Sequence, residues 1–181
     1  MVVECKRESN SKEDMFSKEC WMSYHDQNTD QYNFRHRSIQ QERAWTMKWG
    51  DFHQNLMGSF PGWINYKKGH VSGCDIGKED GSCVVEIKNN ENTMNSSSKS
   101  SVMGKLIKQQ KDGKRAILVI VNGDFSKKID TGIEIMNGKE FYKEISGREK
   151  FMEDLLSTVK HCFSNFKSFE ELQTYLQQYV I

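Results

Sequence analysis

An unbroken apolar run at residues 115–123, RAILVIVNG, constrains the fold more than any other part of the sequence. Its branched apolar residues follow one another without polar alternation, which predicts a strand buried on both faces of a parallel or mixed sheet. Residues 82–88, SCVVEIK, predict another strand, and residues 100–111 predict a short amphipathic helix between the two. Strand, helix and strand over residues 82–121 therefore predict a right-handed crossover within an α/β fold.

A long amphipathic helix is predicted upstream, at residues 38–57. Its large apolar side chains recur at i, i+4, i+7 and i+11, so they form one stripe that is expected to pack in the core. The stripe consists of Trp45, Trp49, Phe52 and Leu56. Ser38 suits the N-cap position, and Gly58 and Pro61 end the helix.

Three strands are predicted between residues 59 and 88, and they lie at 60–68, 70–77 and 82–88. A Lys-Glu-Asp-Gly turn joins the second and third strands as a hairpin. The predicted elements together form a single α/β domain over residues 38–181, with a central mixed β-sheet flanked by helices. Residues 1–37 are polar and charged, and they are expected to form an N-terminal arm or helical extension.

The C-terminal third continues with residues 133–147, which predict two short strands or one strand and an extended loop. Asn137-Gly138 marks a turn within this stretch. Residues 148–163 predict an amphipathic helix, and Ser168 is expected to cap a final helix that extends to the C-terminus.

The composition excludes several classes of protein. The 181 residues carry a net charge of +1, so overall charge does not by itself indicate a nucleic-acid-binding protein. The five cysteines include no Cys-x-x-Cys pair, and they are interpreted as reduced thiols in the cytoplasm. The sequence lacks a signal peptide, a transmembrane segment and a phosphate-binding glycine loop, so neither a membrane partner nor ATP chemistry is expected.

One acidic residue, Asp75, precedes the predicted hairpin turn, and Glu86 and Lys88 follow it on the neighbouring strand. Alternation places Val84, Glu86 and Lys88 on one face of that strand. Two carboxylates and a backbone carbonyl suit Mg²⁺, and a lysine beside them suits an attacking water and a charged phosphate. The same pattern also fits an exposed strand with an ordinary Glu/Lys pair, and spacing alone does not separate the two interpretations.

Four segments together resemble the PD-(D/E)xK nuclease superfamily, in particular the type II restriction endonucleases that cut GGNCC-like or GGWCC-like sites. The resemblance covers roughly residues 40–150, and the EIKN-x-x-NT run after a helix containing FHQN is its most specific part. Cys74 stands where the superfamily name has a proline. The segments are GDFHQNLMGSFPGW at 50–63, GCDIG at 73–77, VVEIKNNENTMN at 84–95 and EFYKEISG at 140–147.

The resemblance implies a restriction-endonuclease-like fold over residues 38–181 and a role for each residue of the pattern. Asp75 and Glu86 would bind Mg²⁺, the backbone carbonyl of Ile87 would complete the ligand set, and Lys88 would act on the nucleophilic water. Such enzymes often use a polar residue from the upstream helix as well. Asp51 and Gln54 are the candidates for this assisting role.

An Asn/Ser/Thr tract, NNENTMNSSSK, follows the strand that carries Glu86 and Lys88. Asn side chains suit base edges, and Ser, Thr and Lys suit phosphate oxygens, so a DNA-facing loop is one interpretation and a solvated loop is the other. The residues expected to contact DNA are Asn89, Asn92, Thr93, Asn95 and Lys99.

The expected function is that of a Mg²⁺-dependent type II restriction endonuclease, which hydrolyses phosphodiester bonds in double-stranded DNA at a short palindromic site. A palindromic site favours a homodimer, because two identical subunits match its two-fold symmetry. A companion DNA methyltransferase acting on the same site is a further expected partner. The alternatives are a less specific nuclease of the same fold, serving repair, recombination or host-DNA degradation, and a catalytically inert DNA-binding module.

Overall fold

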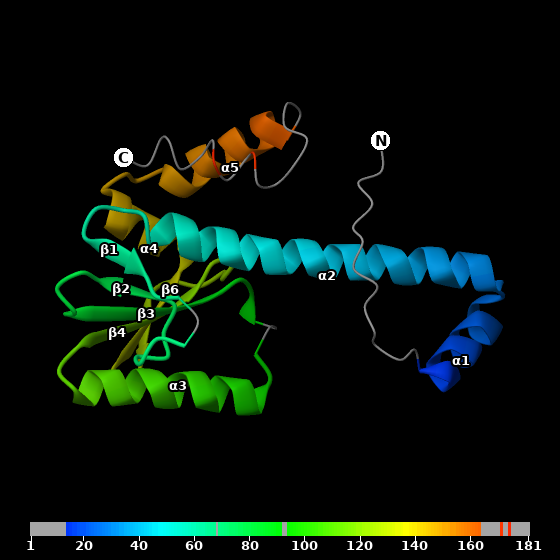
Figure 1. Ribbon diagram of the computed structural model, residues 1–181, viewed down its shortest axis with the longest axis horizontal. Coiled ribbons are helices and arrows are strands. Elements are labelled where there is room, and N and C mark those ends of the chain that lie inside the picture. The colour runs from blue at the N-terminus through cyan, green and yellow to red at the C-terminus, as the bar shows by residue number, and fades with distance from the viewer. Residues whose placement is uncertain (1–13, 68, 92–93, 164–170, 172–173, 175–181) are drawn as a thin grey trace. The chain divides into compact units, whose positions relative to one another are not determined.

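The computed structural model describes residues 14–67, 69–91, 94–163, 171 and 174 (Figure 1). The chain divides into two compact units, residues 1–45 and residues 46–181. This division falls inside helix α2 (Thr29–Met57). Within the described residues, none of the helices has both the length and the apolar character that a membrane span needs.

The first unit is helical in its described part. Helix α1 (Met15–His25) begins where the Asp14 carboxylate accepts hydrogen bonds from two backbone N–H groups. The Arg35 guanidinium lies 3.6 Å from the centre of the Trp21 ring, so a cation–π contact packs α1 against α2.

Helix α2 begins nine residues before the predicted start at Ser38, and that prediction was wrong. The side-chain oxygen of Asn28 accepts from the backbone N–H of Gln31 at 3.0 Å, and that of Gln31 accepts from the backbone N–H of Asn28 at 2.9 Å. This reciprocal cap marks the observed start of α2. Ser38 lies inside the helix, where its hydroxyl donates to the carbonyl of Phe34. The Asn-x-x-Gln spacing at 28–31 was the missed signal.

The second unit contains a mixed sheet, as predicted. Its strand order is β1-β2-β3-β4-β6-β5. The first three strands are antiparallel neighbours, β3, β4 and β6 are parallel, and β5 is antiparallel to β6. The strands are β1 (Trp63–Asn65), β2 (Ile76–Lys78), β3 (Cys83–Lys88), β4 (Arg115–Ile120), β5 (Lys128–Asp130) and β6 (Ile133–Asn137).

Helix α3 (Ser96–Lys111) joins the parallel strands β3 and β4, so the predicted crossover is confirmed. The helix starts four residues before the predicted start at residue 100. The side chain of Asn95 accepts a hydrogen bond from the backbone N–H of Ser98 at 2.8 Å, and this cap turns the serine-rich stretch into the first helical turn. Part of the predicted loop at 89–99 is therefore helix.

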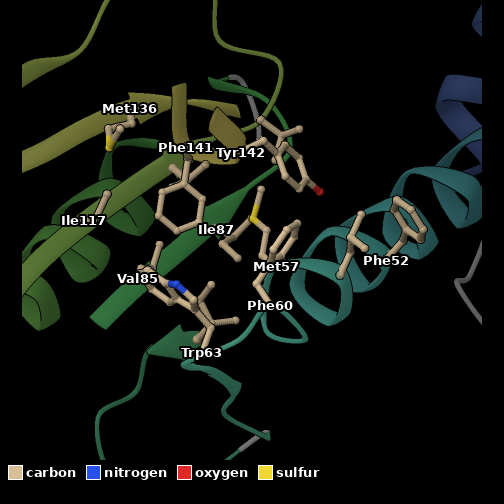
Figure 2. Packing of buried hydrophobic residues seen from close by; sticks show 14 of the residues in the cluster. Phe52, Met57, Phe60, Trp63, Val85, Ile87, Ile117, Met136, Phe141 and Tyr142 are labelled. Atoms are coloured by element: carbon tan, nitrogen blue, oxygen red, sulfur yellow. The ribbon is translucent and has the colours of Figure 1, made fainter. Parts of the chain in front are cut away.

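Helices cover both faces of the sheet (Figure 1). Each face has its own apolar cluster. Val84, Leu106 and Leu118 belong to the cluster beneath α3. On the other face, the side chains of Met57, Ile87 and Phe141 lie together in the larger cluster (Figure 2). The alternation predicted for β3 is therefore confirmed, since Val84 faces α3 and Ile87 faces the opposite side.

Two predicted features of the core differ from the structure. Phe52 and Leu56 are buried as expected, but the Trp45 side chain is 44% exposed, so only the C-terminal part of the predicted stripe enters the core. Residues 138–146 form helix α4 (Gly138–Ser146) rather than a strand or loop. Asn137 and Glu140 form a capping box there, so Asn137-Gly138 begins a helix instead of making a hairpin turn.

Helix α5 (Phe151–Phe163) confirms the amphipathic helix predicted at 148–163. Its buried residues, Val159 and Cys162, join the larger cluster. The predicted final helix and its cap at Ser168 lie outside the described residues, except for residues 171 and 174.

Candidate active site

Asp75 lies directly before β2 and is fixed to β3. Its backbone N–H donates to the carbonyl of Val85 at 3.0 Å, and its carboxylate Oδ2 accepts from the backbone N–H of Ile87 at 2.7 Å. The strand pairing of β2 with β3 ends at Ile76 opposite Val85. The carboxylate therefore accepts the β3 hydrogen bond that a backbone carbonyl of the paired strand would otherwise accept, and this holds it beside the end of β3.

The carbonyl of Ile87 is directed toward the β2 side of β3, where Asp75 lies. The carbonyl of Lys88 accepts from Val121 on the β4 side, whereas the carbonyl of Val85 accepts from Asp75 on the β2 side. Backbone groups alternate in direction along a strand, so the carbonyl of Ile87 points to the side where Asp75 lies. This orientation is the one that a shared ligand set with Asp75 requires.

Glu86 and Lys88 lie on the α3 face of β3. Glu86 is 4% exposed, and the Lys88 ammonium donates to its carboxylate at 2.8 Å. The ammonium of Lys105, from α3, lies 3.7 Å from the same carboxylate oxygen. A buried carboxylate is costly unless a cation offsets its charge, and here two lysines do so.

The electrostatic environment of Asp75 differs from that of a salt-bridged surface carboxylate. Burial is the main cause that raises its pKa to about 6, and the negative charge of Glu86 raises it further. The hydrogen bond from Ile87 and the charges of Lys88 and Lys105 act in the opposite direction. The charge of Glu86 thus disfavours ionisation of Asp75, and a bound divalent cation beside Asp75 would be stabilising.

A hollow of about 560 Å³ opens beside Glu86, between the end of β3 and the first half of α3. Its volume is in the range typical of clefts that bind small ligands. The residues that line it are Glu86, Lys88, Met94, Ser97, Ser98, Ser101, Val102 and Lys105.

The donor set fits Mg²⁺, which binds oxygen ligands and keeps several waters. Two carboxylates, from Asp75 and Glu86, and the carbonyl of Ile87 are the available protein oxygens. Within the described residues, no group of three or more His, Cys, Asp or Glu side chains is placed to hold a metal ion. The site would therefore rely on water and substrate oxygens for its remaining positions.

The two candidate assisting residues lie on α2, which packs on the face of the sheet opposite α3. Asp51 is exposed and Gln54 is half-buried. Gly50 lies next to the Asn89 amide, and Gly58 lies next to Asn65. Gln54 is one turn from each of these glycines, so it belongs to the helix stripe that faces the strand ends, and Asp51 lies off this stripe.

The predicted DNA-contacting residues have different surroundings. The Asn89 amide donates to the carbonyl of Thr46 at 2.8 Å, which ties the end of β3 to α2. Asn95 is exposed and caps α3. Lys99 is exposed and six residues from Lys105, about 120° around the helix from it. Asn92 and Thr93 lie outside the described residues, and the DNA contacts of all five remain predictions.

Lys105 and Ser101 were missed in the sequence. Ser97, Ser101 and Lys105 recur every four residues, which places them on one side of α3. The predicted helix began at residue 100, so Ser97 was assigned to a loop, and the cap at Asn95 was the signal that would have placed it on the helix. Ser101 and Lys105 lay within the predicted helix, but no local pattern indicated that this side of the helix lies beside Glu86.

The sheet order, the helices on both faces and the carboxylate pair at the end of β3 define an α/β fold of the restriction-endonuclease type. The sequence pattern of the Eco47II restriction endonuclease family matches residues 8–168, and the chain belongs to this family. The protein is therefore a restriction endonuclease, a hydrolase that cuts DNA. Neither the curated proteins nor the solved structures gave a significant match.

Proposed function

We propose that the protein is a Mg²⁺-dependent type II restriction endonuclease of the PD-(D/E)xK superfamily, from the branch that cuts GGNCC-like or GGWCC-like sites. The observation that carries this proposal is the convergence of Asp75, Glu86 and Lys88. The Glu86 carboxylate on β3 is buried, its charge acts on the Asp75 carboxylate, and a hollow of about 560 Å³ opens beside Glu86 and Lys88.

In this proposal Asp75, Glu86 and the carbonyl of Ile87 hold Mg²⁺. When bound, the ion polarises the scissile phosphate and lowers the pKa of a bound water. Lys88 donates a hydrogen bond to the attacking water, and its charge stabilises the negative charge that develops on the phosphate oxygens. The water oxygen bonds to phosphorus while the bond from phosphorus to the 3′ oxygen breaks. The water loses a proton to solvent and the 3′ oxygen takes one up, so the products carry a 5′-phosphate and a 3′-hydroxyl.

The proposal extends to DNA binding and assembly. The tract that follows β3 contacts duplex DNA. Of the two candidates on α2 that could assist the metal site, Gln54 is better placed than Asp51. We propose residues 38–181 as the nuclease domain, residues 1–37 as an N-terminal extension, a homodimer that matches a palindromic site, and a companion methyltransferase that protects the host. The proposed DNA contacts are Asn89, Asn92, Thr93, Asn95 and Lys99.

The test is incubation of the purified protein with unmethylated plasmid DNA and Mg²⁺. Discrete fragments with a common sequence at their ends are expected. A smear would instead indicate a less specific nuclease, and binding without cleavage would indicate an inert DNA-binding module. Glu86→Gln is expected to abolish the fragments, and Glu79→Gln, at an exposed position of the β2–β3 turn, is the matched control that retains them.

A further inference from the structure

Lys105 connects three parts of the site. It extends from α3, its ammonium lies 3.7 Å from the Glu86 carboxylate, and it donates to the carbonyl of Gly73 at 3.2 Å. Gly73 is two residues before Asp75, so Lys105 ties the segment that carries one carboxylate to the strand that carries the other. An ammonium group has three N–H donors, and these two contacts leave one for a ligand in the hollow.

Ser101 lies one helical turn before Lys105 and lines the same hollow. Within the described part of the chain, its hydroxyl has no hydrogen-bond partner, whereas the hydroxyls of Ser97 and Ser98 donate to Asn95 at 2.8 and 2.7 Å. A hydroxyl and an ammonium that point into one hollow form a donor set for a phosphate group.

The size of this surface exceeds one phosphate. From Ser97 to Lys105 the helix rises roughly 12 Å, whereas successive nucleotides of one DNA strand are about 3.4 Å apart along the duplex axis. Lys88, on the strand side of Glu86, is placed for the scissile phosphate. Lys105, on the helix side, is therefore placed for a different phosphate of the same strand.

We propose that Lys105 and Ser101 form a binding site for a DNA backbone phosphate that neighbours the scissile one. This inference rests on the proposed function. Lys105 acts as a positioning residue, because its contacts to Glu86 and to Gly73 couple the bound phosphate to the two carboxylates. A DNA strand seated on α3 is then fixed in register with the site of cleavage.

The experiment measures binding of a short duplex that carries the cleavage site read from the plasmid fragments, with Ca²⁺ in place of Mg²⁺ so that the DNA is bound but not cut. Lys105→Met is expected to reduce the slope of log affinity against log salt by about 0.9 for each lysine lost. Lys111→Met, at an exposed position on the same helix, is expected to leave the slope unchanged.

A set of duplexes with single neutral methylphosphonate linkages identifies the phosphate. One position next to the scissile phosphate is expected to weaken binding by the wild-type protein and to have no further effect on Lys105→Met. Lys105→Arg is expected to restore the salt slope, and Ser101→Ala to weaken binding by a few-fold. Thermal unfolding confirms that each variant is folded.

Two results separate this inference from the proposed function. If the wild type cuts at discrete sites but Lys105→Met keeps the full salt slope and the same methylphosphonate profile, the phosphate site is wrong and the function stands. If the wild type gives no discrete fragments, the proposed function fails, and the phosphate site fails with it.

Discussion

Two clusters of charged side chains lie at opposite ends of the parallel strands, and they differ in how well their charges are matched. At the start of β4, the Arg115 guanidinium bonds both oxygens of Glu134, at 2.6 and 2.7 Å, and also bonds Glu144. Lys127 adds a further ion pair to Glu134. At the end of β3, the charge of Glu86 acts on the Asp75 carboxylate, and the ammonium groups of Lys88 and Lys105 lie 2.8 and 3.7 Å from Glu86.

The pKa values of the acids report this difference. Hydrogen bonding to Arg115 is the main cause that lowers the pKa of Glu134 to about 2. Burial, with the charge of Glu86, raises the pKa of Asp75 to about 6. The first cluster therefore stabilises the fold, whereas the second costs folding free energy that a bound cation would recover. An open hollow lies beside the second cluster.

The largest effect is expected at the unmatched cluster. Glu86→Gln removes a proposed metal ligand and should reduce the cleavage rate by about 100-fold or more. Plasmid cleavage at saturating Mg²⁺ measures this loss. Equal rates for Glu86→Gln and the Glu79→Gln control would show that the carboxylate pair is not the site of chemistry.

At the matched cluster, a substitution should affect stability rather than activity. Arg115→Met leaves two carboxylates without their bidentate partner, and the free energy of unfolding should fall by about 2 kcal/mol, since partial exposure screens the loss. Urea denaturation measures this change. Cleavage per folded molecule should stay at the wild-type rate, and a selective loss of activity would remove the distinction between the clusters.

Divalent-metal affinity should depend on pH through Asp75. Below the pKa of about 6, protons compete with the metal for its carboxylate, so Ca²⁺ affinity should fall by about tenfold per pH unit. Titration calorimetry at pH 5, 6 and 7.5 measures the dependence. An affinity that is constant over this range would place the metal away from Asp75.

A smaller effect concerns the free energy of unfolding without metal. The folded pKa of Asp75 lies above its unfolded value of 3.8, so the folded state binds more protons between pH 4 and 6 and loses stability as pH rises through this window. Asp75→Asn removes this cost and should stabilise the protein by about 1 kcal/mol at pH 8. The difference in stability between Asp75→Asn and the wild type should vanish below about pH 4, where the Asp75 carboxyl is protonated and therefore neutral like the Asn amide.

The opposite pH window belongs to Glu134. Its folded pKa of about 2 lies below the unfolded value of 4.5, so its contribution is complete above pH 4.5 and is lost as pH falls toward 2. Urea denaturation across pH 2–8 separates the two windows. Asp75→Asn should leave the acid limb intact, and Glu134→Gln should remove it.

The sequence predicted the sheet because its strongest signals are local. The apolar run at β4 and the alternation along β3 each depend on side-chain pattern alone, and the structure confirms both. The wrong predictions concern helices whose start is set by a capping side chain. Asn28, Asn95 and Asn137 each begin a helix through a side-chain hydrogen bond. The sequence placed Asn28 in the N-terminal arm or helical extension, Asn95 in a loop and Asn137 in a turn.

The candidate site was predictable only in part for a related reason. Glu86 and Lys88 are two residues apart on one strand, so their shared face follows from alternation. Lys105 comes to Glu86 through the crossover, a tertiary contact that no local pattern contains. Cys74, which stands where the superfamily name has a proline, is buried in the cluster beneath α3, so this departure leaves Asp75 in position.

The most direct test of the carboxylate pair as the metal site is oxidative cleavage of the protein by bound Fe²⁺. Radicals generated at the ion with ascorbate cut the chain close to its ligands, and mass spectrometry locates the cuts. We expect cuts near Asp75 and at Glu86 to Lys88, which excess Mg²⁺ and Glu86→Gln both suppress. Cuts elsewhere, or cuts at these residues that neither treatment reduces, would contradict the account.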